Sequence, residues 1–211
     1  MNPDLVPTVT LDAILQPIEK ATGLPNQAYT NENFFAHERD NVLGKGWAGL
    51  WFASDLPKKG YVKPVEFMGL PLVILRNKQN EIKVFHNVCS HRGMLLVHNE
   101  MEVQGALRCK YHSWSYNLDG ELKGTPHLGG IGQQKIDGFN HCDHGLKAVR
   151  SAVWMDVIFI NLSGDAPAFD EYVKPLTEKW QPFLGDTGLE RMRAAVNGKG
   201  LEIEVKSNWK L

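Results

Sequence analysis

The sequence predicts a mainly β protein, in which an antiparallel β domain of many short strands carries a helical extension at each end. Three observations predict this architecture. Between Trp47 and Gly164, runs rich in β-branched and aromatic residues are short and are separated by Gly, Pro, Asn or Lys. Asp119-Gly120 lies between two such runs and is a strong hairpin signal. Apolar residues at helical spacing occur before and after this region.

The N-terminal extension, residues 1–46, is expected to be helical. Two stretches, 11–21 and 31–44, carry apolar residues on one helical face. These residues are Leu11, Ile14, Leu15 and Ile18 in the first stretch, and Phe34, Phe35 and Val42 in the second. Gly44 is placed to end the second helix.

The β domain is expected over residues 47–165. Its strands are predicted in WAGLWFAS, KPVEFMG, LPLVILRN, IKVFHNV, GALRCKY, in the SYNLDGELKG hairpin, and as two more strands in 146–164.

The C-terminal extension is residues 166–211. It begins with a helix over 168–185, which we expect Pro175 to interrupt because proline removes a helical hydrogen bond. A Gly-rich turn at 197–200 precedes a last strand, 201–209.

Composition excludes several classes of function. The chain has 211 residues, 43% of them hydrophobic, and a formal net charge of −1, which argues against a nucleic-acid or polybasic membrane partner. No apolar run approaches the ~18 residues that span a bilayer, and the N-terminus lacks the features of a secretory signal. Three cysteines is a low, odd count that fits a reducing compartment, so a cytoplasmic location is expected.

The chemistry is expected at two short motifs, Cys89-x-His91 and Cys109-x-x-His112, with seventeen residues between them. Two hairpin tips that each supply one thiolate and one imidazole can close over one metal centre. Four such ligands suit a tetrahedral structural zinc, although zinc motifs usually group like ligands together. The mixed pairs also suit two inequivalent irons, one held by both thiolates and one by both imidazoles.

The stretches NVCSHRG and CKYHSWSYNLDGELKGTP resemble the cluster loops of Rieske-type non-haem iron oxygenases, the large (alpha) subunits of ring-hydroxylating dioxygenases and related demethylating monooxygenases. The resemblance implies a Rieske-like fold of several small sheets, with a 2Fe–2S cluster at two hairpin loops. It also implies that Cys89 and Cys109 hold the iron that stays ferric, and that His91 and His112 hold the iron that accepts the electron.

Four neighbouring residues complete the expected site. Gly93 suits a tight chain path, and its N–H is expected to reach a sulfur. Arg92 either pairs with a carboxylate that orients the loop or docks a neighbouring subunit, or is a solvated surface arginine. Trp114 shields the cluster from water, a role that an ordinary core tryptophan shares. Tyr116 is placed to hydrogen-bond a ligating sulfur.

Two positions depart from the family pattern C-P-Y-H-G-W, where this chain has Lys110 and Ser113. Neither is a ligand position. Respiratory Rieske proteins add one cysteine to each loop, at the positions of Met94 and Tyr111, and a serine at that of Trp114. Fewer hydrogen bonds to sulfur imply a lower potential, which suits an oxygenase.

The resemblance implies an electron-transfer function, with an NAD(P)H-dependent reductase or a ferredoxin as donor and neighbouring subunits in a homotrimer. In the family, a mononuclear iron on two histidines and a carboxylate lies in a C-terminal domain. Here the last histidine is His144, and the NWK stretch that begins that domain is followed only by Leu211. We therefore expect residues 166–211 to be a helical linker followed by the first strand, 201–209, of a truncated catalytic domain. The fragment alone is expected to pass an electron but to be inactive as an oxygenase. The alternatives are a free-standing Rieske ferredoxin and a zinc-stapled interaction module.

Two other motifs are expected to carry no chemistry. The residues of HCDH, 141–144, are too close in sequence to bind one metal together easily. The stretch LGGIGQQ, 128–134, lacks the full glycine fingerprint of a nucleotide site and is expected to be a loop.

Overall fold

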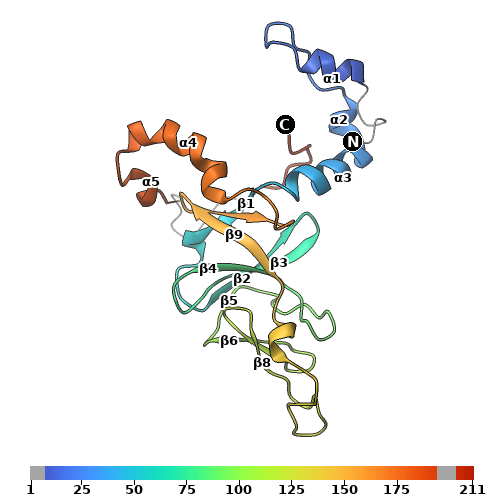
Figure 1. The fold of residues 1–211 in the computed structure, drawn as a ribbon, viewed down its shortest axis with the longest axis vertical. Helices are drawn as coiled ribbons and strands as arrows, with labels where there is room; N and C mark the ends of the chain where they lie inside the picture. Colours follow the sequence, from blue (N-terminus) through green and yellow to red (C-terminus); the bar gives the residue numbers. More distant parts are fainter. Residues whose placement is uncertain (1–7, 194–202) are drawn as a thin grey trace.

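The computed structural model describes residues 8–193 and 203–211, and it is mainly antiparallel β (Figure 1). A seven-stranded sheet has the order β1-β10-β9-β4-β3-β2-β5, and a three-stranded sheet has the order β6-β7-β8. The strands are β1 Ala48–Phe52, β2 Tyr61–Phe67, β3 Leu70–Arg76, β4 Ile82–His86, β5 Met101–Glu102, β6 Ala106–Arg108, β7 Ser115–Asn117, β8 Leu122–Gly124, β9 Ala148–Trp154 and β10 Val157–Asn161. The predicted fold class is therefore confirmed, and only the two-residue β5, which pairs with β2, was not predicted.

Strand β3 forms the centre of the core because it is buried on both faces. Successive side chains of a strand point to opposite faces. Leu72 and Ile74 pack into a cluster formed with β4, β9 and β10, whereas Val73 and Leu75 pack into a second cluster shared with the small sheet. This second cluster includes both candidate cysteine ligands.

Tight turns set the register of the hairpins. The β7–β8 connection carries the predicted Asp119-Gly120, and Gly120 has a φ of +84°. Its N–H donates to the Asn117 carbonyl oxygen at 3.1 Å, which closes the turn. Met68-Gly69 and Met155-Asp156 connect β2–β3 and β9–β10, with all four residues at positive φ.

The N-terminal helices are shorter than predicted. Helix α1, Thr8–Ile14, stops before 15–21 because Pro17 has no N–H to continue the ladder. Short helices α2, Gln27–Thr30, and α3, Glu32–Glu38, follow, and the π-helix η1, Arg39–Leu43, continues α3. Gly44 follows it, as predicted, and donates its N–H to the Arg39 carbonyl oxygen at 2.8 Å.

The C-terminal extension corrects two expectations. Helix α4, Phe169–Leu184, runs through Pro175 without interruption. The carbonyl that Pro175 leaves without a partner is that of exposed Glu171, where water can replace the lost bond. The predicted strand 201–209 is absent over its described part, 203–209, where Ile203 and Val205 are exposed and pair with no strand. Its first two residues and the predicted turn at 197–200 lie outside the described chain. The remaining helices are η2 Ala53–Asp55, η3 His141–His144 and α5 Gly188–Arg191.

The C-terminal residues instead bind the N-terminal helices, at the end of the molecule opposite the small sheet (Figure 1). Lys210 Nζ lies 2.6 Å from Glu38 Oε2, and both side chains are mostly buried. Asn208 Nδ2 donates to the Tyr29 carbonyl oxygen at 3.2 Å. Nowhere in the described residues is there a helix with the length and apolarity to cross a bilayer.

Replacing Gly120 by alanine tests the turn. A Cβ at Gly120 would lie 2.4 Å from Cε1 of buried Phe85, and the positive φ adds strain. We expect Gly120→Ala to lower the free energy of unfolding by about 3 kcal/mol in urea denaturation. The matched control, Gly69→Ala, has a similar φ of +79° but no atom near the new Cβ. It should cost only about 1 kcal/mol, and equal losses would contradict the steric argument.

Candidate metal centre

The first candidate loop follows β4 and is closed by backbone hydrogen bonds. The Cys89 N–H donates to the Met94 carbonyl oxygen at 2.8 Å, and the Gly93 N–H donates to the Cys89 carbonyl oxygen at 3.0 Å. Gly93 has a φ of +71°. Buried Asn87 secures the base of the loop, since its side chain both accepts from and donates to the backbone of Val97.

The second loop connects β6 and β7 and repeats this geometry. The Cys109 N–H donates to the Trp114 carbonyl oxygen at 2.8 Å, and the Ser113 N–H donates to the Cys109 carbonyl oxygen at 3.0 Å. Ser113, at the position equivalent to Gly93, has a φ of +58°. The two loops therefore share these two hydrogen bonds and a residue at positive φ four positions after the cysteine, although their ligand spacing differs by one residue.

The loops bring the four predicted ligands together as two pairs. Cys89 and Cys109 are each 2% exposed and lie in the same core cluster. His91 and His112 are half-buried, with ring centroids 4.7 Å apart. The Trp114 indole stacks on His91 at 4.5 Å and 12°, and it is buried. The thiols are thus on the inner side of the centre and the imidazoles on its rim.

The donor set fits a metal cluster. His112 Nδ1 is buried and has no hydrogen-bond partner, a costly state for an imidazole nitrogen that a metal ion would relieve. Burial, together with neighbouring His112 and Arg92, lowers the pKa of His91, which favours the neutral imidazole that binds metal. Two thiols and two imidazoles are the ligands of a Rieske-type 2Fe–2S cluster.

The environment of Cys89 opposes a free thiolate. Burial raises the pKa of the Cys89 thiol, and the hydrogen bonds from Tyr116 and the His91 backbone N–H lower it only in part. The neighbouring Cys109 raises it further. A bound cation would supply the compensating charge, because metal ions hold coordinating thiols deprotonated.

Tyr116 contacts the sulfur as the sequence predicted, with its Oη 3.1 Å from Cys89 Sγ. Burial and the bond to Cys89 raise the pKa of Tyr116, so the phenol keeps its proton. Sequence reasoning missed Ser90, whose N–H and Oγ both lie within hydrogen-bond distance of Tyr116 Oη. It also missed His144, whose carbonyl oxygen accepts from Ser90 Oγ at 2.6 Å. No local signal marks this contact, since 54 residues separate its partners.

One expected contact is different in the structure. The Gly93 N–H was expected to reach a sulfur, but it donates to the Cys89 carbonyl oxygen. The backbone N–H of His91 is the one that hydrogen-bonds the Cys89 sulfur. Arg92 is exposed and forms no ion pair within the described residues, as expected of a solvated surface arginine. Its docking to a neighbouring subunit stays a prediction.

The motif at 141–144 forms η3, in which His141 Nε2 lies 3.0 Å from Thr125 Oγ1 and Cys142 is exposed. Among the described residues, the four candidate ligands included, no three or more His, Cys, Asp or Glu side chains are grouped around one single-ion position. A 2Fe–2S cluster of the Rieske type does not need such a group, because each of its irons takes only two protein ligands.

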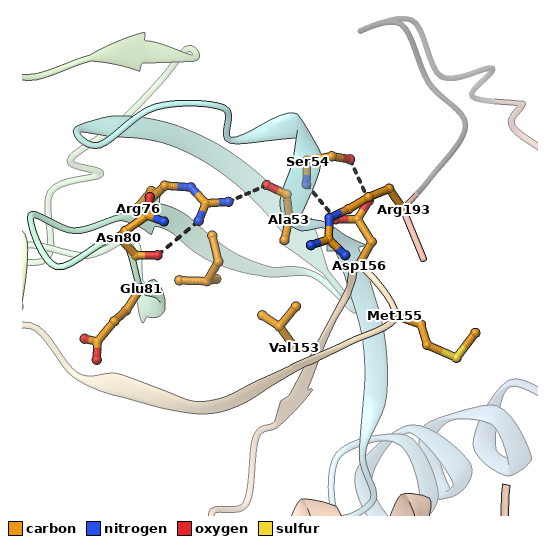
Figure 2. A pocket seen from close by; sticks show the side chains of 10 residues that line it. Ala53, Ser54, Arg76, Asn80, Glu81, Val153, Met155, Asp156 and Arg193 are labelled. Carbon is orange, nitrogen blue, oxygen red and sulfur yellow. Dashed lines mark hydrogen bonds between the residues drawn. The ribbon is translucent and has the colours of Figure 1, made fainter. Parts of the chain in front are cut away.

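A polar cavity of about 480 Å³ lies beside the β9–β10 turn (Figure 2). Several of the polar groups that line it are hydrogen-bonded within the protein. The Ser54 N–H and Oγ both donate to Asp156, and Arg76 donates to the carbonyl oxygens of Leu56, Ala53 and Asn80. None of the candidate ligands lines this cavity.

Comparison with known proteins gives three kinds of match. The sequence matches the Rieske [2Fe-2S] domain family over residues 46–137. It is 28% identical over 219 aligned positions to the glycine betaine monooxygenase oxygenase subunit of Pseudomonas aeruginosa, covering 99% of this chain and 48% of that protein. It is 30% identical to the biphenyl 2,3-dioxygenase subunit alpha of Rhodococcus jostii, covering 93% of this chain and 42% of that protein. The chain thus spans about half the length of these relatives.

Solved structures share the fold. The apo form of a quaternary ammonium Rieske monooxygenase superimposes with a TM-score of 0.69 and 24% identity, over 78% of this chain and 47% of that one. Naphthalene 1,2-dioxygenase from a Rhodococcus species, bound to indole, gives a TM-score of 0.64 and 25% identity, over 75% and 36% of the two chains.

The equivalent positions Gly93 and Ser113 give a paired test of loop strain. We expect Ser113→Gly to raise the free energy of unfolding by about 0.5–1 kcal/mol, because relief of the left-handed strain exceeds the entropic cost of glycine. Gly93→Ala should lower it by about 1 kcal/mol, through φ alone since no atom lies near its Cβ. Urea denaturation measures both, and a loss of stability in Ser113→Gly would show that the serine hydroxyl has a compensating role.

Proposed function

Because the chain contains a Rieske 2Fe–2S domain and is homologous to the alpha subunits of Rieske oxygenases, we propose that it is the electron-transfer part of such an oxygenase. The reaction class is hydroxylation or oxidative demethylation with O₂. The observation that carries the proposal is the pairing of two buried thiols with two rim imidazoles on loops closed by the same two hydrogen bonds.

Each residue of the centre has a defined task. Cys89 and Cys109 would hold one iron, and His91 and His112 the other, with His112 Nδ1 as a donor already free of other partners. When bound, the cluster supplies a one-electron redox couple. Trp114 packs on His91 and excludes water from the inner side. The half-buried imidazoles form the edge at which an electron donor approaches.

The partners follow from the oxygenase assignment. We propose an NAD(P)H-dependent reductase or a ferredoxin as donor and neighbouring subunits, as a homotrimer, in the full-length protein. The mononuclear iron that activates oxygen would be held in a C-terminal domain outside residues 1–211, and the protein would be cytoplasmic. Similarity to oxygenase subunits over 99% of this chain supports this assignment.

A free-standing Rieske ferredoxin is the second candidate. It would need little chain outside the cluster fold. Here the segments outside residues 47–165 include helices α1–α4 and the contact between Glu38 and Lys210. The similarity to glycine betaine monooxygenase also includes these segments, which favours the oxygenase.

Metal analysis tests the proposed cluster. The purified protein should contain about two irons and about two acid-labile sulfides per chain, with a rhombic electron paramagnetic resonance signal of low average g after dithionite reduction. His112→Ala should lose the signal, whereas His98→Ala, an exposed histidine outside the centre, should retain it. One zinc per chain and no signal, even after anaerobic reconstitution with iron and sulfide, would favour the zinc-stapled module.

The fragment should transfer electrons without oxygenase activity. With a Rieske oxygenase reductase and NADH, we expect the 211-residue protein to pass electrons to a soluble acceptor such as cytochrome c. Candidate substrates such as glycine betaine, carnitine or biphenyl should yield no hydroxylated or demethylated product. Stoichiometric product formation by residues 1–211 would contradict the assignment of oxygen activation to another domain.

A further inference from the structure

A hydroxyl network beside Cys89 connects the centre to η3. Tyr116 Oη lies 3.1 Å from Cys89 Sγ and 2.9 Å from Ser90 Oγ. The Ser90 N–H donates to Tyr116 Oη at 3.1 Å, and Ser90 Oγ donates to the His144 carbonyl oxygen at 2.6 Å. Ser90 therefore lies between the phenol that contacts the sulfur and a helix that contains no ligand.

Counting protons shows that Cys89 and Ser90 compete. Each hydroxyl has one proton, and a carbonyl oxygen can only accept. The proton of Ser90 is therefore used in the bond to His144, and any proton between Ser90 and Tyr116 must come from Tyr116. A metal-bound thiolate has no proton, so Tyr116 must also be the donor in the hydrogen bond to Cys89. Ser90 and Cys89 therefore compete for the one hydroxyl proton of Tyr116.

We propose that Ser90 is a positioning residue that sets how strongly Tyr116 hydrogen-bonds the Cys89 sulfur, and that η3 acts on the centre through Ser90. This inference rests on the proposed function. Hydrogen bonds to cluster sulfurs raise the reduction potential. When Tyr116 donates its proton to Ser90 Oγ, its hydrogen bond to the Cys89 sulfur weakens, and the reduction potential is therefore lower.

The position of η3 then becomes a control on the potential. If His144 moves away, Ser90 can donate its own proton to Tyr116 Oη, and the Tyr116 proton is directed entirely to the sulfur. Contacts with other elements hold η3 in place: His141 Nε2 lies 3.0 Å from Thr125 Oγ1, and the Trp114 ring packs edge-on against the Phe139 and His144 rings, at 5.7 and 6.3 Å between centroids. Residues 139–144 are thus coupled to the centre although none of them is a ligand.

Redox titration of the cluster-loaded 211-residue protein tests this inference, followed by circular dichroism or electron paramagnetic resonance. Ser90→Ala removes the competing acceptor and should raise the potential, whereas Tyr116→Phe removes the donor and should lower it. Ser90→Thr keeps the hydroxyl and should match the wild type. The double variant should match Tyr116→Phe, because Ser90 acts only through Tyr116. Iron and sulfide content, measured for every variant, ensures that only loaded proteins are compared.

Several outcomes would overturn the inference. A potential lowered in Ser90→Ala as it is in Tyr116→Phe would mean that Ser90 only holds the phenol in place. A Ser90→Ala shift that persists in the Tyr116→Phe background would mean that Ser90 acts on the centre independently of Tyr116. A wild-type protein that assembles no 2Fe–2S cluster would overturn the proposed function, and this inference with it. An intact wild-type cluster with the wrong order of variant potentials would overturn this inference alone.

Discussion

The bond from each cysteine N–H to a carbonyl oxygen five residues later is the constraint on which the centre depends. It closes each loop, and each closed loop contains one residue in the left-handed backbone conformation, Gly93 in the first and Ser113 in the second. The closed loops place both thiols in the core cluster and leave both imidazoles at the rim. Burial favours the protonated thiol, but a metal cluster needs thiolates. The loops thus preorganise a site whose charge balance is complete only with metal, so metal binding and loop stability are coupled.

Local chemistry explains which features the sequence could predict. The ligands follow from two motifs, and the strands follow from short β-rich runs ended by turn residues such as Asp119-Gly120. Features that depend on distant partners were not predictable. The short strand β5 exists because β2 offers it an edge, and residues 203–209 have no such edge and form no strand. Pro175 was expected to interrupt α4, but the exposed position of Glu171 limits the cost of the lost bond. The contact between Ser90 and His144 has no signature in either motif.

The two ends of the chain, predicted as separate extensions, are in contact. The Lys210 ammonium lies 2.6 Å from the Glu38 carboxylate and 5.5, 5.4 and 5.2 Å from the ring centroids of Tyr29, Phe34 and Trp209. Aromatic faces attract a cation, and the carboxylate neutralises it, so a largely buried lysine is tolerated. This contact holds the chain that follows α4 against the helices that precede β1. It therefore places the C-terminal residues at the end of the molecule remote from the small sheet (Figure 1).

The centre has two sides with different physical constraints. Around Cys89, buried Tyr116, exposed Ser90 and the backbone are committed by hydrogen bonds, and a change there alters the electrostatics of the sulfur. On the outer side, Arg92, Met94, Lys110 and Tyr111 are exposed around the imidazoles and form no hydrogen bond to a sulfur in the described chain. Hydrogen bonds to sulfur set the potential, whereas exposed side chains set which surface can approach the histidines. Lys110, which replaces the usual proline of the family, lies on this outer side. In the proposed electron-transfer function, partner choice would therefore be set at the rim, and the potential by the hydrogen bonds around Cys89.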